Sequence, residues 1–189
     1  MEIEYLKYCK HKKDLEKMAC KQSYWPKLWA NHVREQKGYY DTLCEEDARV
    51  RIISEKNFRE RSNKLNCNEM GIHVKIGDIC FIDFGMSYLN ETGFQHFGVV
   101  MKFCNNKAFV VPMSSNANSY QQAYGKESGK GKKHLMRLGK IEGMNKESVL
   151  FLNDSRWINT ARIIEVMAHI DPKGEMYNEI MERLLLCLK

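Results

Sequence analysis

A short polar segment, residues 90–96, lies between two apolar runs and holds side chains that can do chemistry. Glu91 supplies a carboxylate and His96 supplies an imidazole. An unperturbed histidine titrates near ~6.5, so it can take up or release a proton at neutral pH. Further along the chain, Ser114 and Ser115 supply hydroxyl groups that can donate hydrogen bonds. These residues direct the search for a functional site to this part of the chain.

The segments that must position these side chains are three short runs rich in Val, Ile and Phe, at residues 79–84, 98–103 and 108–113. Such runs, separated by Gly, Asn and Lys turns, predict three adjoining strands. The link at residues 104–107 is short and contains two asparagines, which favours a hairpin. The longer loop at residues 85–97 carries the polar segment, and a loop held by two buried strands is well placed for binding.

Several motifs follow one another in order over residues 74–170. They are Gly77-Asp78, Asp83, Glu91, Gly93, Val99-Val100, the run Val111-Pro112-Met113-Ser114-Ser115, the run Asn153-Asp154-Ser155-Arg156-Trp157-Ile158, and Arg162-Ile163. This order resembles the PemK/MazF toxin endoribonucleases. The family carries an Arg-Pro pair where this chain has His96-Phe97, and a threonine where it has Ser114.

The resemblance implies an α+β protein built on a small SH3-like β-barrel. It also implies a toxin of a toxin-antitoxin system that cleaves single-stranded RNA at specific sequences without a metal ion. The implied partners are RNA, a second copy of the chain in a homodimer, and a cognate antitoxin protein that blocks the RNA groove. Two other readings stay open: a non-catalytic module that binds RNA or protein on the same barrel, and a purely structural oligomerisation domain.

Metal-independent RNA cleavage needs a base for the 2′-hydroxyl, an acid for the leaving 5′-oxygen and a donor to the phosphate. We expect His96 to shuttle protons, Ser114 to support the phosphate, and Glu91 to orient His96 or contact a nucleobase. The alternatives are a surface histidine without a catalytic role and a serine pair that caps the strand.

Residues 116–137 are polar and basic and predict a long mobile loop that could clamp a phosphate backbone. A solvated hairpin tip is the alternative. Asp154 and Arg156 form either an ion pair that holds the fold or part of the RNA surface. The candidate RNA-binding residues are Gln95, Ser115, Lys126, Lys130, Lys132, Lys133, His134, Arg137 and Arg156.

The remaining segments complete the expected architecture. Residues 140–144 and 148–153 predict the closing strands of the barrel, and apolar residues at helical spacing from Met176 to Leu188 predict a C-terminal amphipathic helix. The charged residues 1–70 predict a helical N-terminal extension, and residues 71–189 the barrel domain with its C-terminal helix.

Composition gives weaker guidance. The formal net charge of +6 mildly favours a polyanionic partner. Seven cysteines without a Cys-x-x-Cys pair indicate reduced thiols, and the dispersed histidines form no metal motif, so no cofactor is expected. Since no stretch approaches the roughly 20 apolar residues of a membrane span, we expect a cytoplasmic protein without a membrane partner.

Overall fold

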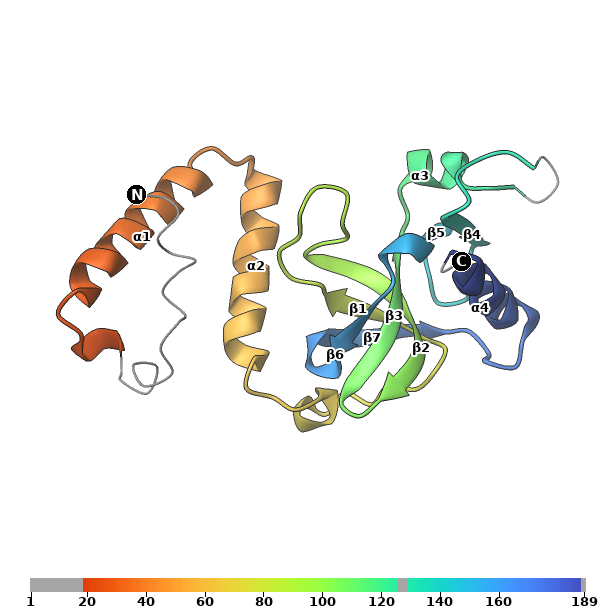
Figure 1. Ribbon diagram of the computed structural model, residues 1–189. Helices are drawn as coiled ribbons and strands as arrows, with labels where there is room; N and C mark the ends of the chain where they lie inside the picture. Colours follow the sequence, from red (N-terminus) through yellow and green to blue (C-terminus); the bar gives the residue numbers. More distant parts are fainter. Residues whose placement is uncertain (1–18, 126–128, 188–189) are drawn as a thin grey trace. The chain divides into compact units, whose positions relative to one another are not determined.

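The computed structural model describes residues 19–125 and 129–187 (Figure 1). Residues 1–18 of the predicted extension, the candidate Lys126 and the last residue of the predicted helical stripe, Leu188, lie outside the described residues. The chain divides into two compact units, residues 1–48 and 49–189. The first contains the short 3-10 helix η3 (Ala19–Lys21) and α1 (Trp25–Tyr40), whose first turn accommodates Pro26 because a proline there removes no intrahelical hydrogen bond.

The second unit is built on one seven-stranded antiparallel sheet (Figure 1). Its strands are β1 (Asp78–Asp83), β2 (Gln95–Cys104), β3 (Lys107–Ser114), β4 (Leu135–Gly139), β5 (Ser148–Phe151), β6 (Arg156–Asn159) and β7 (Ile163–His169). The order across the sheet is β4-β5-β3-β2-β1-β7, and β6 pairs with β3. The predicted α+β class, with short antiparallel strands in an SH3-like arrangement and helices before and after them, is confirmed.

The strands β1, β2 and β3 form the predicted meander. Asn105 adopts the left-handed conformation, with φ of 53°, in the turn between β2 and β3, and the predicted hairpin is therefore confirmed. β3 changes its neighbour along one edge: Lys107 to Val110 pair with β6, whereas Met113 and Ser114 pair with β5. This change brings the end of β3 beside β5.

Alternation along the strands gives the sheet two apolar faces. Ile79, Val99 and Val111 point into one core cluster, while Cys80 and Val100 point into the other. Successive side chains of a strand point to opposite faces, so a β-branched run that is buried on both sides satisfies both clusters.

The helix α4 (Glu175–Cys187) covers the first of these faces and confirms the predicted C-terminal amphipathic helix. Tyr177, Ile180 and Leu184 are its buried residues. The Tyr177 hydroxyl donates a hydrogen bond of 2.5 Å to the carbonyl oxygen of Met101, and burial raises the pKa of this phenol. No helix of the described residues combines the length and apolar composition needed to cross a lipid bilayer.

The helix α2 (Glu45–Arg61) belongs to the sheet-containing unit from Arg49 onward. Acidic residues fill its first turn and arginines its last turn, which matches the helix dipole. Ser54 is its one buried residue, and polar hydrogen bonds, described below, attach it to the end of β1. Two further 3-10 helices, η4 (Cys67–Met70) and η6 (Thr160–Arg162), lie near each other.

Gly77 and Asp78, the first of the resembling motifs, have structural roles here. Gly77 has φ of 90°, and a Cβ atom on it would lie 2.1 Å from the carbonyl oxygen of Ile170. The Asp78 carboxylate lies 2.8 Å from Nδ1 of His169 and accepts a hydrogen bond from the Lys75 amide. This pair therefore fixes the approach of β1 to the end of β7.

Three segments differ from the sequence-based expectation. Residues 116–137 are not one loop, because Asn116 caps the helix α3 (Ala117–Gln122) and the buried Leu135 and Met136 begin β4. Residues 140–144 are not a strand, because β4 ends at Gly139, whose φ of 67° disfavours continuation. The loop expected to end at residue 97 ends at residue 94, since β2 begins at Gln95 opposite Asp83.

Candidate active site

An open polar pocket of about 530 Å³ lies where the β1–β2 loop, the ends of β2 and β3, α3 and the segment before β4 meet. Its lining comprises Asn90, Glu91, Thr92, Gly93, His96, Ser114, Asn116, Ser119, Gln122, Lys132, His134, Leu135, Phe151, Asn153 and Asp154. Five of these residues were predicted as functional from separate parts of the sequence: Glu91, His96, Ser114, Lys132 and His134. The fold brings all five to one cavity.

The β1–β2 loop is closed at its base by backbone hydrogen bonds. The Phe84 amide donates to the Phe94 carbonyl at 2.7 Å, and the Phe94 amide donates to the Gly85 carbonyl at 2.6 Å. Gly93 is tightly enclosed, because a Cβ atom there would lie 2.0 Å from Oγ of Ser87. The loop thus holds its backbone close to the start of β2.

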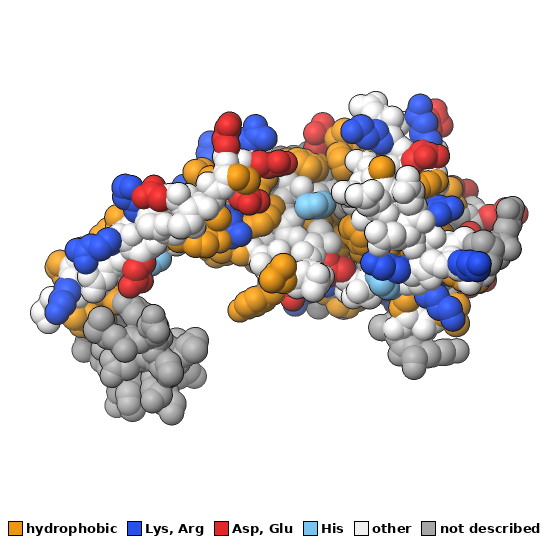
Figure 2. Space-filling model, turned by 90° about the horizontal axis from the view of Figure 1, so that it is seen from above, with side chains coloured by type: hydrophobic (Ala, Val, Ile, Leu, Met, Phe, Trp, Pro, Cys, Tyr) orange, Lys and Arg blue, Asp and Glu red, His pale blue; other side chains and the backbone are white. Residues whose placement is uncertain are grey.

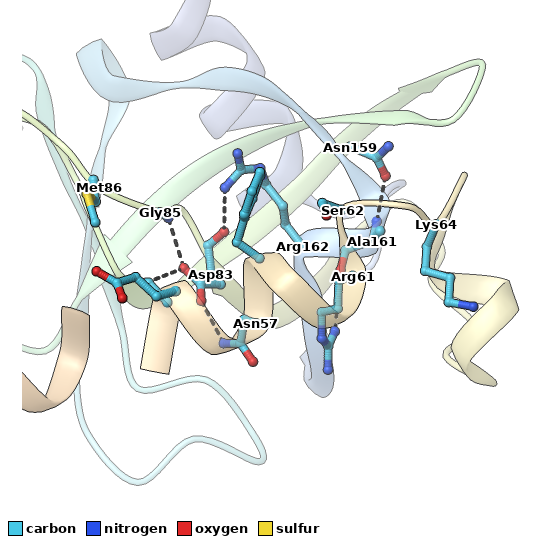
Figure 3. A pocket seen from close by; sticks show the side chains of 13 residues that line it. Asn57, Arg61, Ser62, Lys64, Asp83, Gly85, Met86, Asn159, Ala161 and Arg162 are labelled. Carbon is cyan, nitrogen blue, oxygen red and sulfur yellow. Dashed lines mark hydrogen bonds between the residues drawn. The ribbon is translucent and has the colours of Figure 1, made fainter. Parts of the chain in front are cut away.

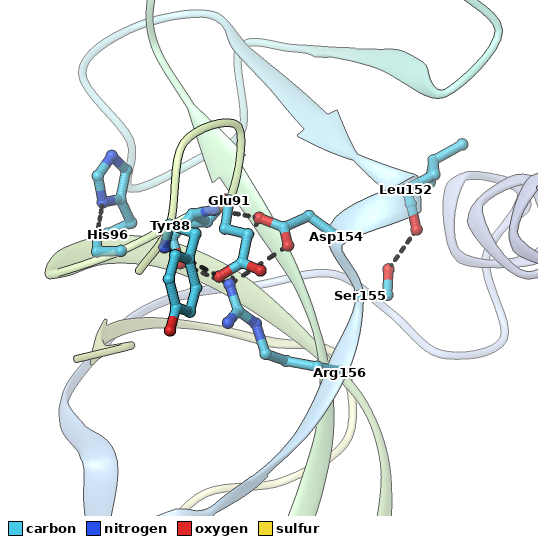
Figure 4. Close-up of polar contacts among 9 residues, drawn as sticks. Tyr88, Glu91, His96, Leu152, Asp154, Ser155 and Arg156 are labelled. Carbon is cyan, nitrogen blue, oxygen red and sulfur yellow. Dashed lines mark hydrogen bonds and ion pairs between the residues drawn. The ribbon is translucent and has the colours of Figure 1, made fainter. Parts of the chain in front are cut away.

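His96 lies opposite Ile82 in the β1–β2 ladder, and its ring is oriented by the loop (Figure 4). Its Nδ1 lies 2.7 Å from the carbonyl oxygen of Gly93. A carbonyl oxygen can only accept, so Nδ1 must carry the proton of this hydrogen bond. In the neutral ring Nε2 then keeps its lone pair, and no hydrogen bond of the described residues engages it. This nitrogen can accept a proton from a bound molecule.

A second set of contacts holds the loop from the side of η5 (Leu152–Asp154) and β6 (Figure 4). The Thr92 amide donates a short hydrogen bond to the Asp154 carboxylate. Nη2 of Arg156 donates to the Thr92 carbonyl at 2.5 Å and lies 3.3 Å from Oδ1 of Asp154. Asp154 and Arg156 therefore form a pair that holds both backbone groups of the residue beside Gly93.

Glu91 is exposed at the rim of the pocket. Its Oε2 accepts a hydrogen bond of 3.2 Å from the Tyr88 amide, within the turn that the loop makes (Figure 4). The His96 ring is oriented by the hydrogen bond that its Nδ1 donates to the Gly93 carbonyl, and the described residues show no hydrogen bond between Glu91 and His96. The carboxylate is instead available to a molecule that enters the pocket.

Ser114 ends β3 and combines the two roles that the sequence left open. Its Oγ accepts a hydrogen bond of 3.1 Å from the Asn116 amide, which caps the end of the strand. The hydroxyl proton remains free to donate into the pocket that Ser114 lines. Ser115 is exposed and does not line this pocket.

Lys132 and His134 line the pocket from the segment between α3 and β4. The Lys132 amide donates to the Gln122 carbonyl at 2.8 Å, which ties this segment to the end of α3. His134 is half-buried immediately before β4. Figure 2 shows Lys and Arg side chains spread over the part of the molecule that carries α3.

The other candidate RNA-binding residues that the structure describes do not line the pocket. The Gln95 amide bonds to Ser54 and Asp83 on the face opposite His96. The Arg137 guanidinium donates to the Tyr120 and Gln121 carbonyls and lies over the Tyr120 ring. Lys130 and Lys133 are exposed, and Arg156 holds the loop as described above.

A second cavity of about 400 Å³ lies on the α2 side of β1 (Figure 3). Beside it, the buried Asp83 carboxylate accepts hydrogen bonds from Ser54 Oγ at 2.6 Å, Asn57 Nδ2 at 2.6 Å, the Gly85 amide at 2.9 Å and Gln95 Nε2 at 3.2 Å. With four donors on its two oxygens, this carboxylate is fully engaged. The cluster attaches α2 to the sheet.

Sequence reasoning missed the contribution of the polar residues Asn116, Ser119, Gln122 and Asn153 to the pocket. The Asn-x-x-Ser sequence at the start of α3 is a helix N-cap signal that could have indicated the helix, and with it these positions. The described residues contain no group of three or more His, Cys, Asp or Glu side chains arranged to bind a metal ion.

Comparison with known proteins gives likenesses at the level of structure. No protein-family model matches the sequence, and neither does any curated protein. The chain is similar to MazF from Deinococcus radiodurans, with a TM-score of 0.46 and 16% identity over 61% of this chain and 96% of that one. It is also similar to the toxin MazF-mt6 from Mycobacterium tuberculosis, with a TM-score of 0.42 and 9% identity over 59% and 95% of the two chains. A mycobacterial endoribonuclease in complex with its cognate antitoxin gives a TM-score of 0.43 and 8% identity over 61% and 95%.

Proposed function

We propose that this protein is a sequence-specific endoribonuclease that cleaves single-stranded RNA without a metal ion and acts as the toxin of a toxin-antitoxin system. The observation that carries the proposal is the meeting of His96 and Ser114 in one polar pocket, with the His96 ring held so that Nε2 faces no partner among the described residues. These two residues stand where the resembled family has its arginine and its threonine.

The proposed chemistry begins with the 2′-hydroxyl of the nucleotide in the pocket. His96 Nε2 takes the proton of this hydroxyl while the 2′-oxygen attacks the adjacent phosphorus. The Ser114 hydroxyl and the Lys132 ammonium donate to the non-bridging phosphate oxygens, where negative charge increases in the transition state. The products are an RNA with a 2′,3′-cyclic phosphate and an RNA with a 5′-hydroxyl.

The partners expected from the sequence belong to this proposal as well. A homodimer and a cognate antitoxin would both need exposed surface near the pocket, and cleavage of cellular RNA would place the protein in the cytoplasm. The β1–β2 loop offers such a surface, because Met86, Tyr88 and Leu89 are 58, 86 and 94% exposed. Exposed apolar side chains grouped on one loop are typical of protein contact sites.

The test is cleavage of a mixed-sequence single-stranded RNA in EDTA by the wild-type chain and by His96→Ala. We expect products with 2′,3′-cyclic phosphate ends from the wild type and a loss of about 10²–10⁴-fold in the variant. His73→Ala is the matched control, because His73 is an exposed histidine that does not line the pocket. Circular dichroism checks that each variant is folded.

Two other results would count against the proposal. If the wild-type chain binds RNA without cleaving it, the non-catalytic binding module becomes the better description. If His96→Ala cleaves as fast as the wild type, the protein is a nuclease but the chemistry lies elsewhere.

A further inference from the structure

We infer that His134 is a second catalytic residue, the general acid that protonates the leaving 5′-oxygen. This inference rests on the proposed function and deepens it, because the sequence suggested only an RNA-binding role for His134. The reason to look for a second group is geometric. In an in-line displacement the attacking and leaving oxygens lie on opposite sides of the phosphorus, so two groups on opposite walls serve the reaction better than one.

His134 lines the same pocket as His96 but belongs to a different segment of the chain. His96 comes from β2 and the loop side, whereas His134 comes from the segment between α3 and β4. The described residues engage neither nitrogen of the His134 ring in a hydrogen bond. The imidazole is therefore free to donate a proton to a bound molecule and to exchange it with water.

The backbone around His134 is firmly held, unlike that of a mobile basic loop. Three consecutive carbonyl oxygens accept hydrogen bonds: Arg183 Nη2 donates to Lys133 at 2.8 Å and to Leu135 at 3.2 Å, and the Leu152 amide donates to His134 at 2.8 Å. These hydrogen bonds fix the backbone of His134 beside the pocket that its side chain lines. A fixed backbone position is one requirement of a group that takes part in catalysis.

A short path of hydrogen bonds connects the two histidines. The His134 carbonyl binds the amide of Leu152, the first residue of η5, and the last residue of η5 is Asp154. The Asp154 carboxylate accepts from the Thr92 amide, and the next carbonyl, that of Gly93, orients the His96 ring. One 3-10 helix thus contacts both the backbone of His134 and the loop that orients the His96 ring.

The proton balance of the step is complete. The 2′-oxygen gives its proton to His96 Nε2 and forms a bond to phosphorus, while the bond from phosphorus to the 5′-oxygen breaks. The 5′-oxygen receives the proton that the His134 ring carried. Exchange with water then returns His96 to its neutral form and His134 to its protonated form.

The test uses two RNA substrates that differ in one atom. The first has the natural 5′-oxygen at the bond that the wild-type chain cleaves, and the second has a bridging sulfur there. A thiolate leaves without protonation, so the second substrate needs no general acid. We expect His134→Gln to lower cleavage of the oxygen substrate by about 10²–10⁴-fold and to cleave the sulfur substrate within about tenfold of the wild type.

The controls separate this inference from the proposed function. His96→Ala should be slow on both substrates, because the base is needed in each case, and His73→Gln should match the wild type on both. His134→Asn repeats the measurement in a second variant, and circular dichroism checks the fold of each.

Two outcomes would overturn the inference. Equal losses on the two substrates in both His134 variants would show that this residue binds phosphate and is not the acid. A wild-type chain that cleaves neither substrate would instead overturn the proposed function on which the inference rests.

Discussion

Two neighbouring residues of β2, Gln95 and His96, point to opposite sides of the sheet and enter very different surroundings. On the Gln95 side, the buried Asp83 carboxylate is saturated by four donors and the helix α2 is attached to β1. On the His96 side, a pocket contains an imidazole nitrogen, a hydroxyl proton and a lysine that face open space.

This difference shows how one strand end can serve stability and chemistry together. Buried polar groups that satisfy one another add rigidity, whereas a site for a substrate must leave donors and acceptors unengaged. The rigid side fixes the β1–β2 ladder from which His96 projects. The comparison predicts that substitutions on the Gln95 side lower stability and that substitutions on the His96 side lower activity.

The largest expected effect is that of Asp83→Ala. Its loss leaves the donors of Ser54 and Asn57 without their acceptor and removes one of the acceptors of Gln95, which should lower the free energy of unfolding by about 3 kcal/mol. Urea denaturation followed by circular dichroism measures this change. The variant, assayed where it remains folded, should keep cleavage within about threefold of the wild type. A variant of unchanged stability would contradict the assigned role of the cluster.

Gly93→Ala tests the loop on the other side. The added methyl group would meet Oγ of Ser87 at 2.0 Å and displace the carbonyl that orients His96, so cleavage should fall about tenfold or more with little change in stability. The double variant Gly93→Ala, Ser87→Gly removes the clashing side chain and should recover most of the activity. If the double variant does not recover activity, the clash with Ser87 is not the reason that Gly93→Ala lowers cleavage.

Gln95→Ala separates the two sides most directly, because Gln95 is adjacent to His96 and was a candidate RNA contact. The structure predicts a loss of about 1 kcal/mol in the free energy of unfolding, from the hydrogen bonds to Ser54 and Asp83. RNA affinity and cleavage should stay within about twofold of the wild type. A clear loss of RNA affinity at unchanged stability would restore the RNA-binding role.

The smallest expected effect concerns Cys80, on the buried face of β1. Burial, with Asp78 and then Cys67 as lesser causes, raises the pKa of this thiol from 9.0 to about 12. Iodoacetamide at pH 8 should therefore modify the exposed Cys44 and Cys104 and leave Cys80 unmodified in the folded protein. Mass spectrometry of the digested protein gives the modified positions, and rapid labelling of Cys80 would contradict its burial.

The same shift has a consequence for stability against pH. Since the folded thiol holds its proton more tightly than the unfolded one, its contribution is complete below pH 9 and is lost as the pH rises from 9 toward 12. Cys80→Ala should therefore weaken the decline of stability over that alkaline range. If stability declines equally in Cys80→Ala and in the wild type, the decline arises from the titration of other groups.

The sequence predicted the elements with strong apolar patterns and missed those held by polar contacts. The β-branched runs of β1, β2 and β3 are continuous apolar segments, and the apolar stripe of α4 has a helical period. The attachment of α2 depends on Ser54, Asn57 and Arg61, whose hydrogen bonds to the sheet unit give no hydrophobic pattern.

The candidate site was predictable to a similar degree. His96, Ser114 and Glu91 were identifiable because their side chains are of types that can transfer protons or donate to a phosphate. The orientation of His96 was not, since the group that sets it is the carbonyl of Gly93, and a backbone oxygen has no signature in the sequence. The assignment of Gln95 to the α2 side required knowing that β2 begins at residue 95, three residues earlier than its apolar run.

Along one edge of β3 the neighbouring strand changes from β6 to β5 before the pocket is reached. Lys107 to Val110 bind β6, Met113 and Ser114 bind β5, and Val111 and Pro112 between them pair with neither. Pro112 has no amide proton to donate, so it fits the interruption. His134 is attached through β4 and β5, whereas Arg156, on β6, holds the loop that orients His96. The distance between the two imidazoles therefore depends on two separate strand pairings. Hydrogen exchange at the Val149 and Leu150 amides would report how often the pairings of β5 open, and so how constant the width of the pocket is.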